Sequence, residues 1–384
     1  MSVERIEVVG DDLPALVDAI RAALEGGVDL LCTSGGLGPT HDDLTMEAVA
    51  AATGRPLALH PAALAMVEER SRGLRQTPAV ARRVREKQAM LPAGATALPP
   101  IGTAPGAALE HDGALVIVLP GPPWEVERMW EAARAEPPLA ALLARGGQPS
   151  ERVLRAFAVP ESRVVAALGP LDPDAWDRLT VGICARDAEL EVTVRSAPED
   201  VWAAEALEEL LGAELGAALY SRDGATVDEI VARRLVAAGQ TVAVAESCTG
   251  GGLGARLTAL AGSSAYVVGG VISYSDAVKR DVLGVDAEVL RRHGAVSGPV
   301  AERMATGARE LLGSDWALSI TGIAGPGGGS PEKPVGLVYV GVAGPGGVAA
   351  REHRLRGDRE AIRDRSAALA VHALRVAVEA GRAV

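Results

Sequence analysis

The segment AESCTGGG, residues 245–252, constrains the fold of its surroundings more than any other stretch of this chain. The apolar run before it, residues 241–244, is typical of a short buried strand, and residues 253–260 have the pattern of a helix. The glycines between them predict a tight turn that aims backbone N–H groups at one small space. Because the helix dipole favours negative charge there, a phosphate or an oxyanion would be stabilised. The same residues also suit a plain strand-to-helix turn with a hydroxyl as N-cap.

A second glycine loop, SGGLGPTHDDLT at residues 34–45, stands between an apolar run at 28–33 and an expected helix at 44–53. Such a loop can hold a phosphate, and its two aspartates can hold Mg²⁺ against that phosphate. The aspartates are equally suited to cap the helix and complement its dipole. The candidate phosphate and metal residues are Gly35, Gly36, Gly38, Thr40, Asp42 and Asp43.

The remaining patterns predict an α/β protein with a mostly parallel sheet in its N-terminal half, a linker at 134–150, a small α+β unit at 152–215, and a second α/β region. We expect further strands at 3–9, 113–119, 152–159, 189–195, 266–274, 316–320, 337–342 and 348–355. We expect further helices at 13–24, within 62–90, from about 124, and at 198–215, 227–238, 277–283, 298–312 and 358–380.

Composition excludes several classes of protein. The net charge of −12 disfavours nucleic-acid binding through a basic surface, and no apolar run is long enough to span a bilayer. Three distant cysteines form no disulfide framework, and the N-terminus lacks the form of a signal peptide, so we expect a cytoplasmic location. Only three of the 38 basic residues are lysines: Lys87, Lys279 and Lys333. Since lysine can lose its proton and arginine cannot, a retained lysine is a candidate for chemistry.

The candidate nucleophile Ser247 has no obvious histidine base, and a neutral lysine or a tyrosine can take that role. Tyr274 and Lys279 follow the next expected strand. If the two strands are parallel neighbours, these side chains approach Ser247. Cys248 is the rival nucleophile, although a free cysteine is commonly a small buried apolar residue. The glycine loop at 321–336, with Lys333, is placed to hold a phosphate or carboxylate.

Four strings of the C-terminal region resemble the nicotinamide-nucleotide amidase domain of the competence/damage-inducible CinA family. They are AESCTGG at 245–251, SYSDAVK at 273–279, HGAVSGPV at 293–300, and SITGIAGPGGGSPEKPVG at 319–336. Residues 1–145 resemble the family's molybdopterin-binding-like domain through SGGLGPTHDDLT, GTAPG at 102–106 and LPGPPWE at 119–125. Residues 150–218 then correspond to its small KH-like connector, and residues 222–384 to the amidase domain.

The resemblance implies hydrolysis of the carboxamide of nicotinamide mononucleotide to nicotinate mononucleotide and ammonia, without a cofactor. By this likeness Ser247 is the nucleophile, and Tyr274 and Lys279 activate it. The N–H groups of Thr249 and Gly250 would hold the oxyanion. The expected substrate-binding residues are Thr249, Gly250, Gly251, Thr321, Gly322, Gly325 and Lys333.

The same resemblance links the N-terminal domain to a metal-dependent ADP-ribose pyrophosphatase. Relative to the family, this chain begins at the second strand, so on the order of 30 residues, one strand–helix unit, are expected to be lacking. In this alternative function, Asp42 and Asp43 would bind Mg²⁺, and ADP-ribose would be the substrate of the N-terminal domain. A non-enzymatic role in competence or DNA damage is a further alternative. We also expect a homodimer.

Overall fold

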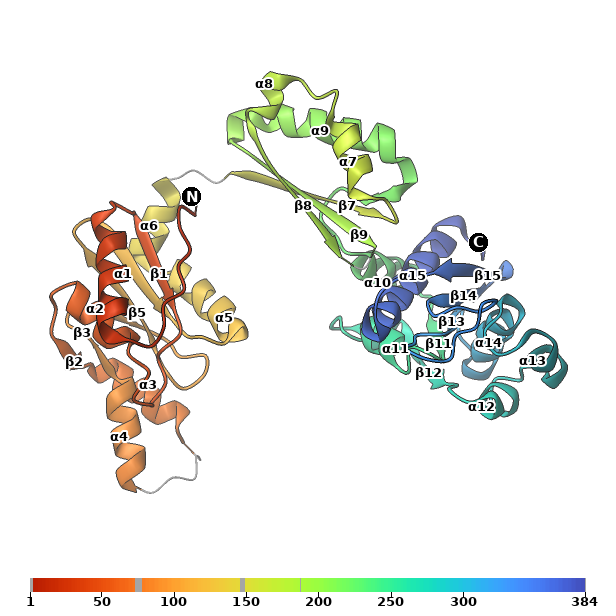
Figure 1. The fold of residues 1–384 in the computed structure, drawn as a ribbon, viewed down its shortest axis with the longest axis horizontal. Coiled ribbons are helices and arrows are strands. Elements are labelled where there is room, and N and C mark those ends of the chain that lie inside the picture. The colour runs from red at the N-terminus through yellow and green to blue at the C-terminus, as the bar shows by residue number, and fades with distance from the viewer. Residues whose placement is uncertain (1–2, 73–77, 146–148, 187, 384) are drawn as a thin grey trace. The chain divides into compact units, whose positions relative to one another are not determined.

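The computed structural model describes residues 3–72, 78–145, 149–186 and 188–383, which form two compact units, 1–148 and 149–384. In the first unit, a four-stranded sheet of order β1-β6-β5-β4 lies between α1 to α3 on one face and α5 and α6 on the other (Figure 1). Its helices are α1 (Leu13–Glu25), α2 (Thr45–Ala52), α3 (Pro61–Arg70), α4 (Pro78–Gln88), α5 (Pro123–Arg134) and α6 (Pro137–Arg145). Its strands are β1 (Leu30–Ser34), β2 (Leu57–Leu59), β3 (Met90–Pro92), β4 (Thr96–Leu98), β5 (Gly106–His111) and β6 (Ala114–Leu119).

Three expectations for this unit are wrong. Residues 3–9 are not a strand, and Val3, Ile6 and Val8 are 77%, 86% and 96% exposed, because alternating apolar residues form a strand only where a sheet edge pairs with them. The four-stranded sheet is mostly antiparallel, since only β1 and β6 pair in parallel. The expected linker at 134–150 contains helix α6, whose alanines and leucines are strong helix formers.

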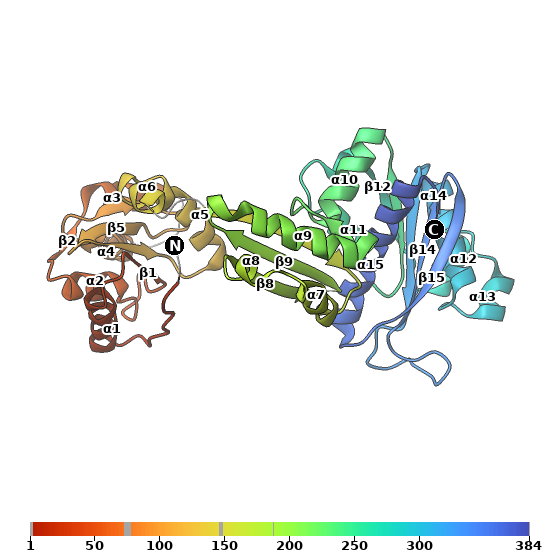
Figure 2. The same cartoon turned by 90° about the horizontal axis from the view of Figure 1, so that it is seen from above.

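The second unit begins with a sheet of order β10-β7-β9-β8, covered on one face by α7 and α9 (Figure 2). This sheet and its helices are called the connector below. Sequence patterns had indicated β7, β9 and α9, but not β8 or α7. The connector contains β7 (Ser150–Phe157), α7 (Glu161–Leu168), α8 (Pro173–Trp176), β8 (Leu179–Arg186), β9 (Glu189–Ser196), η1 (Pro198–Asp200), α9 (Val201–Leu215), η2 (Gly216–Ala218) and β10 (Leu219–Ser221).

The C-terminal part of this unit is a three-layer α/β/α domain around a sheet of order β12-β11-β13-β14-β15. Helices α10, α11 and α15 cover one face, and α14 covers the other (Figures 1 and 2). Its helices are α10 (Val227–Ala238), α11 (Gly252–Leu257), η3 (Ser263–Ala265), α12 (Asp276–Asp281), α13 (Ala287–His293), α14 (Gly298–Leu312) and α15 (Arg359–Ala380). Its strands are β11 (Val242–Glu246), β12 (Val267–Ile272), β13 (Trp316–Gly322), β14 (Leu337–Gly344) and β15 (Gly347–Arg354).

The topology of this domain decides where its chemistry lies. Central strand β11 pairs in parallel with both β12 and β13. The loops that follow these three strands therefore leave the same edge of the sheet, where open α/β sheets bind ligands. The predicted proximity of residues 247 and 273–279 rests on this parallel pairing, which the structure confirms. None of the helices in the described residues has the length and hydropathy needed to cross a membrane.

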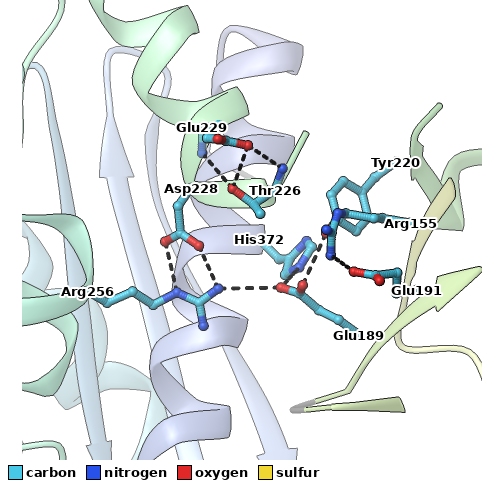
Figure 3. A network of polar contacts seen from close by, with 9 residues as sticks. All are labelled: Arg155, Glu189, Glu191, Tyr220, Thr226, Asp228, Glu229, Arg256 and His372. Carbon is cyan, nitrogen blue, oxygen red and sulfur yellow. Dashed lines mark hydrogen bonds and ion pairs between the residues drawn. The ribbon is translucent and has the colours of Figure 1, made fainter. Parts of the chain in front are cut away.

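A polar network joins the connector to the C-terminal domain (Figure 3). Glu189, at the start of β9, accepts hydrogen bonds from His372 Nε2 at 2.9 Å and from the Tyr220 hydroxyl at 3.1 Å. Its carboxylate also lies 3.4 Å from Nη2 of Arg256, which forms a two-point pair with Asp228. Burial raises the pKa of Glu189, but its bond from His372 and the charges of His372 and Arg256 outweigh burial and lower it. Glu189 is therefore an ionised acceptor bonded to both α11 and α15.

Replacing Glu189 by glutamine is expected to lower the free energy of unfolding by about 1–3 kcal/mol, because a charged acceptor of several partly buried donors is lost. Urea unfolding of the full chain, followed by circular dichroism, measures the change. Glu191→Gln on the same strand is the matched control. Its more exposed carboxylate forms an ion pair with Arg155, so a change below about 0.5 kcal/mol is expected. Equal effects of the two substitutions would contradict a special role for Glu189.

Candidate active site

Glu246 holds the turn that carries Ser247. Its carboxylate, only 1% exposed, accepts hydrogen bonds from the backbone N–H groups of Gly251, Leu253 and Gly254 at 2.8–3.0 Å. The N–H of Ser247 donates to the carbonyl of Ile320 on β13 at 2.9 Å. Glycine is needed at 250 and 251, where φ is +58° and +102°. The N-terminus of α11 is thus already paired with a carboxylate, so it does not attract a phosphate, and the N–H of Gly251 is not free for substrate.

Lys279, one of the two bases predicted for Ser247, lies beside it. Its Nζ lies 3.3 Å from Ser247 Oγ and also donates to the carbonyl of Ser273 at 2.9 Å. The residue is 1% exposed, although Asp276 Oδ1 lies 3.6 Å from the same nitrogen. Burial lowers the pKa of Lys279 against the opposing charge of Asp276. A buried amine that is neutral more readily than an ordinary lysine can accept a proton from the serine hydroxyl.

Tyr274 lies at the same edge of the sheet, but its hydroxyl points to a different partner. The side chain is 60% exposed, and its hydroxyl accepts a hydrogen bond from Arg359 Nη2 at 3.1 Å. Its carbonyl, rather than its phenol, faces Lys279, with Nζ at 3.5 Å. Lys279 therefore reaches Ser247 directly, and this geometry does not require a proton path through the Tyr274 phenol.

The backbone donors near Ser247 differ in availability. The N–H of Gly250 donates to the carbonyl of Ser247 at 3.1 Å, so it is occupied. The N–H of Thr249 has no acceptor among the residues that the structure describes. The Thr249 carbonyl accepts from Arg363 Nη2 at 2.7 Å, which holds this peptide in place. Of the two expected oxyanion donors, Thr249 is thus the one whose N–H is unpaired among the described residues. The residue is 0% exposed, however, and, like Gly250 and Gly251, it does not line the cavity beside Ser247.

Ser247 opens onto a cavity of about 260 Å³. Two of the expected substrate-binding glycines, Gly322 and Gly325, line it, but Thr321 and Lys333 do not. Thr321 Oγ1 donates to the Ala295 carbonyl at 2.8 Å, and Lys333 Nζ donates to the carbonyls of His293 and Val296 at 2.6 and 2.7 Å. These side chains fasten the glycine loop to the segment before α14. The full lining is Ser247, Cys248, Tyr274, Gly322, Ile323, Ala324, Gly325, Gly327, Gly328 and Arg359.

Sequence reasoning missed Arg359, the first residue of α15, which lines this cavity. It donates to the carbonyl of Gly325 at 2.7 Å and to the Tyr274 hydroxyl. Among so many arginines, nothing in its local sequence distinguishes it. The available signal was its position at the start of the final helix, which packs beside the central strands.

The N-terminal glycine loop has a different geometry. Asp43 Oδ2 accepts from the N–H and hydroxyl of Thr40 at 2.9 and 2.6 Å, and Lys87 donates to the Thr40 carbonyl. Gly36, Gly38, Asp43 and Lys87 line a cavity of only about 40 Å³, far below the ~300 Å³ at the lower end of small-molecule sites.

A metal ion has little support in this loop. The Asp43 carboxylate accepts two hydrogen bonds from Thr40 within the same turn, whereas Asp42 is exposed. Gly35 lies against Gly121 rather than in the cavity lining. Within the described ranges, no three or more histidine, cysteine, aspartate or glutamate side chains are grouped to hold a metal ion. The residues do not fit a Mg²⁺ site, and we derive no step through one.

Cys248 is expected to react slowly with thiol reagents. Burial raises its pKa to about 11, so little thiolate exists at neutral pH. We predict that iodoacetamide at pH 7.5 alkylates the exposed Cys184 at least about tenfold faster than Cys248 in the folded chain. Peptide mass spectrometry over time measures both rates, and the unfolded chain serves as control, with similar rates at both positions. Faster alkylation of Cys248 would make it the stronger nucleophile candidate.

Comparison with known proteins places this geometry in a family. A profile described as the CinA C-terminal domain matches residues 224–378, and one described as a probable molybdopterin binding domain matches residues 1–140. The chain is 46% identical over 379 residues to a CinA-like protein of Mycolicibacterium vanbaalenii, covering 96% of this chain and 89% of that protein. A CinA-like protein of Mycobacterium tuberculosis is 42% identical over 378 residues, covering 95% of this chain and 87% of that protein.

Solved structures match part of the chain. A competence-damaged protein (CinA) superfamily protein from Klebsiella pneumoniae is 39% identical, covers 41% of this chain and 99% of its own, and has a TM-score of 0.39. The near full-length matches to CinA-like proteins decide the assignment: the chain belongs to the CinA family.

Proposed function

We propose that the C-terminal domain is a serine amidase that hydrolyses the carboxamide of nicotinamide mononucleotide to nicotinate mononucleotide and ammonia. The observation that carries the amidase chemistry is the buried Lys279 amine 3.3 Å from Ser247 Oγ, at the wall of a cavity. The choice of substrate rests on the family resemblance. The cavity beside this pair supports a catalytic role, because a lysine–serine contact that is only structural needs no space for a substrate.

In the proposed reaction, neutral Lys279 takes the proton of Ser247 as Oγ attacks the amide carbon. The oxyanion of the tetrahedral intermediate is stabilised by the positive charge that Lys279 gains with the serine proton. Lys279 then returns the proton to the nitrogen, the C–N bond breaks, and ammonia leaves an acyl ester on Ser247. Water, deprotonated by Lys279, attacks this ester, and the carboxylate product departs as the proton returns to Ser247. Every step uses side chains of this domain, and none needs a metal.

Two other functions have weaker support. No observation among the described residues favours a metal-dependent ADP-ribose pyrophosphatase, since the cavity of the N-terminal loop is far smaller than a nucleotide phosphate site requires. The acidic composition disfavours a role that depends on direct DNA binding. The amidase is the function that the site supports best.

The decisive assay is ammonia release from nicotinamide mononucleotide. We expect Ser247→Ala to lower kcat/KM at least about a thousandfold, because the nucleophile is lost. Cys248→Ala and added chelator are expected to leave most of the activity. Circular dichroism and thermal unfolding must first establish that both variants fold like the wild type. A folded wild type that releases no ammonia would refute the amidase, and activity that follows Cys248 would refute the nucleophile.

The pH dependence tests the role of Lys279. Only the neutral amine accepts a proton, so kcat/KM should rise with pH and level off above the lowered pKa of Lys279. Lys279→Met, of similar size but without a titratable group, should lose about 10²- to 10⁴-fold in rate. It should also lose this ascending limb. Lys279→Arg keeps the charge but not the base, and is expected to be equally inactive. Unchanged pH limbs in Lys279→Met would rule out Lys279 as the base.

A further inference from the structure

Arg359 forms no ion pair with a carboxylate among the residues that the structure describes. Its guanidinium donates to two neutral oxygens, the carbonyl of Gly325 and the hydroxyl of Tyr274. No aspartate or glutamate in the described ranges lies within ion-pair distance of it. Other arginines of this domain are paired, as Arg256 is with Asp228 and Arg375 with Glu379. A guanidinium carries five N–H donors, so Arg359 keeps donors and a full charge available at the cavity.

The surroundings reinforce this charge. Arg363, one turn further along α15, also lacks a carboxylate partner among the described residues and donates to the carbonyl of Thr249. Burial is the main effect on the pKa of the neighbouring Cys248 and raises it, whereas the charges of both arginines lower it. Glu246, a buried carboxylate next to Ser247, is compensated by three backbone N–H groups. Within a chain of net charge −12, this cavity is therefore a local positive site.

The lysine expected to hold an anion is committed elsewhere. Lys333 donates to two carbonyls that precede α14 and is absent from the cavity lining. Arg359, in contrast, lies in the lining with Ser247. A ligand with its reacting group at Ser247 thus meets the guanidinium elsewhere in the same cavity. The side chain of Arg359 is exposed, which suits a ligand group that remains partly in water.

We propose that Arg359 is the specificity-determining residue of the site and binds the phosphate monoester of the substrate. This inference rests on the proposed amidase function and names the group that selects a nucleotide over a nucleoside. A planar guanidinium donates two parallel hydrogen bonds to phosphate oxygens, which a lysine amine does not reproduce. The cavity, of about 260 Å³, is near the ~300 Å³ lower end for small-molecule sites. The carboxamide and ring would occupy this volume, with the phosphate at the guanidinium.

The test compares two substrates that differ only in the phosphate: nicotinamide mononucleotide and its dephosphorylated nucleoside. For each enzyme, the ratio of the two kcat/KM values measures recognition of the phosphate. We expect Arg359→Gln to lower this ratio about 10- to 100-fold, mostly through KM of the nucleotide. Arg359→Lys should restore part of the ratio. If Arg359 merely positions Tyr274 and Gly325, both substrates lose activity alike and the ratio stays constant, which would overturn the proposal.

Lys333→Gln is the matched control, because it removes a positive charge from the glycine loop at 321–336, to which Arg359 is also hydrogen-bonded. We expect its ratio to equal that of the wild type within about twofold, since the Lys333 amine is bonded to carbonyls rather than lining the cavity. A fall in the ratio for Lys333→Gln alone would assign the phosphate to that lysine and overturn the proposal.

Binding measurements separate this inference from the proposed reaction. Isothermal titration calorimetry with nicotinate mononucleotide and its nucleoside requires no turnover. A wild type that hydrolyses neither substrate refutes the amidase, yet tighter nucleotide binding that is lost in Arg359→Gln would still support Arg359 as the phosphate site. Equal binding of nucleotide and nucleoside by the wild type would overturn the inference even if the amidase is active.

Discussion

The Glu246 carboxylate accepts hydrogen bonds from three backbone N–H groups, and the geometry of the candidate site depends on these bonds. They fix the first turn of α11 against the end of β11, and with the Ser247–Ile320 bond they set the position of the nucleophile. They also compensate the positive end of the helix dipole, which the sequence alone suggests as an anion-binding site. As a result, the positive charge at the cavity is that of the Arg359 guanidinium, whereas the Lys279 amine beside Ser247 has a pKa lowered by burial. In the proposed amidase, a carboxylate at 246 thus leaves bond cleavage to Ser247 and Lys279 and anion recognition to Arg359.

The same scaffold connects the site to the rest of its unit. Helix α15 carries Arg359 and Arg363 beside the cavity and His372 at the connector. Helix α11 follows the nucleophile turn and carries Arg256, which meets the connector through Glu189. Both helices that frame the site are therefore bonded to one carboxylate of β9 (Figure 3). The connector also packs on α15, where Phe157 stacks on His372 with ring centroids 3.5 Å apart. These contacts hold the two helices against the connector.

The sequence was informative where one local rule decides the outcome. Parallel pairing of β11 and β12 brings residues 247 and 279 together, and hydrophobic runs and glycine turns are enough to predict it. It was uninformative where a residue's role depends on its partners. Lys333 and Arg359 are both cations near a glycine loop, and only the folded structure shows that Arg359 lines the cavity while Lys333 is bonded to two carbonyls outside the lining. The strand expected at 3–9 failed for a similar reason, since pairing at a sheet edge is a property of the neighbour. The domain boundaries and the homodimer stay predictions.

Comparison of the two glycine loops indicates that a strand–turn–helix pattern does not by itself specify a function. In the N-terminal loop, Asp43 accepts from Thr40, Lys87 donates to the Thr40 carbonyl, and the remaining volume is far below that of a small-molecule site. Its polar groups satisfy one another. In the C-terminal turn, Glu246 satisfies the backbone just as fully, yet open volume is lined by Ser247, which contacts the buried Lys279 amine, and by a guanidinium with no carboxylate partner among the described residues. Chemistry is therefore expected where charge is left uncompensated beside space for a ligand, and the glycines only shape the backbone that permits it.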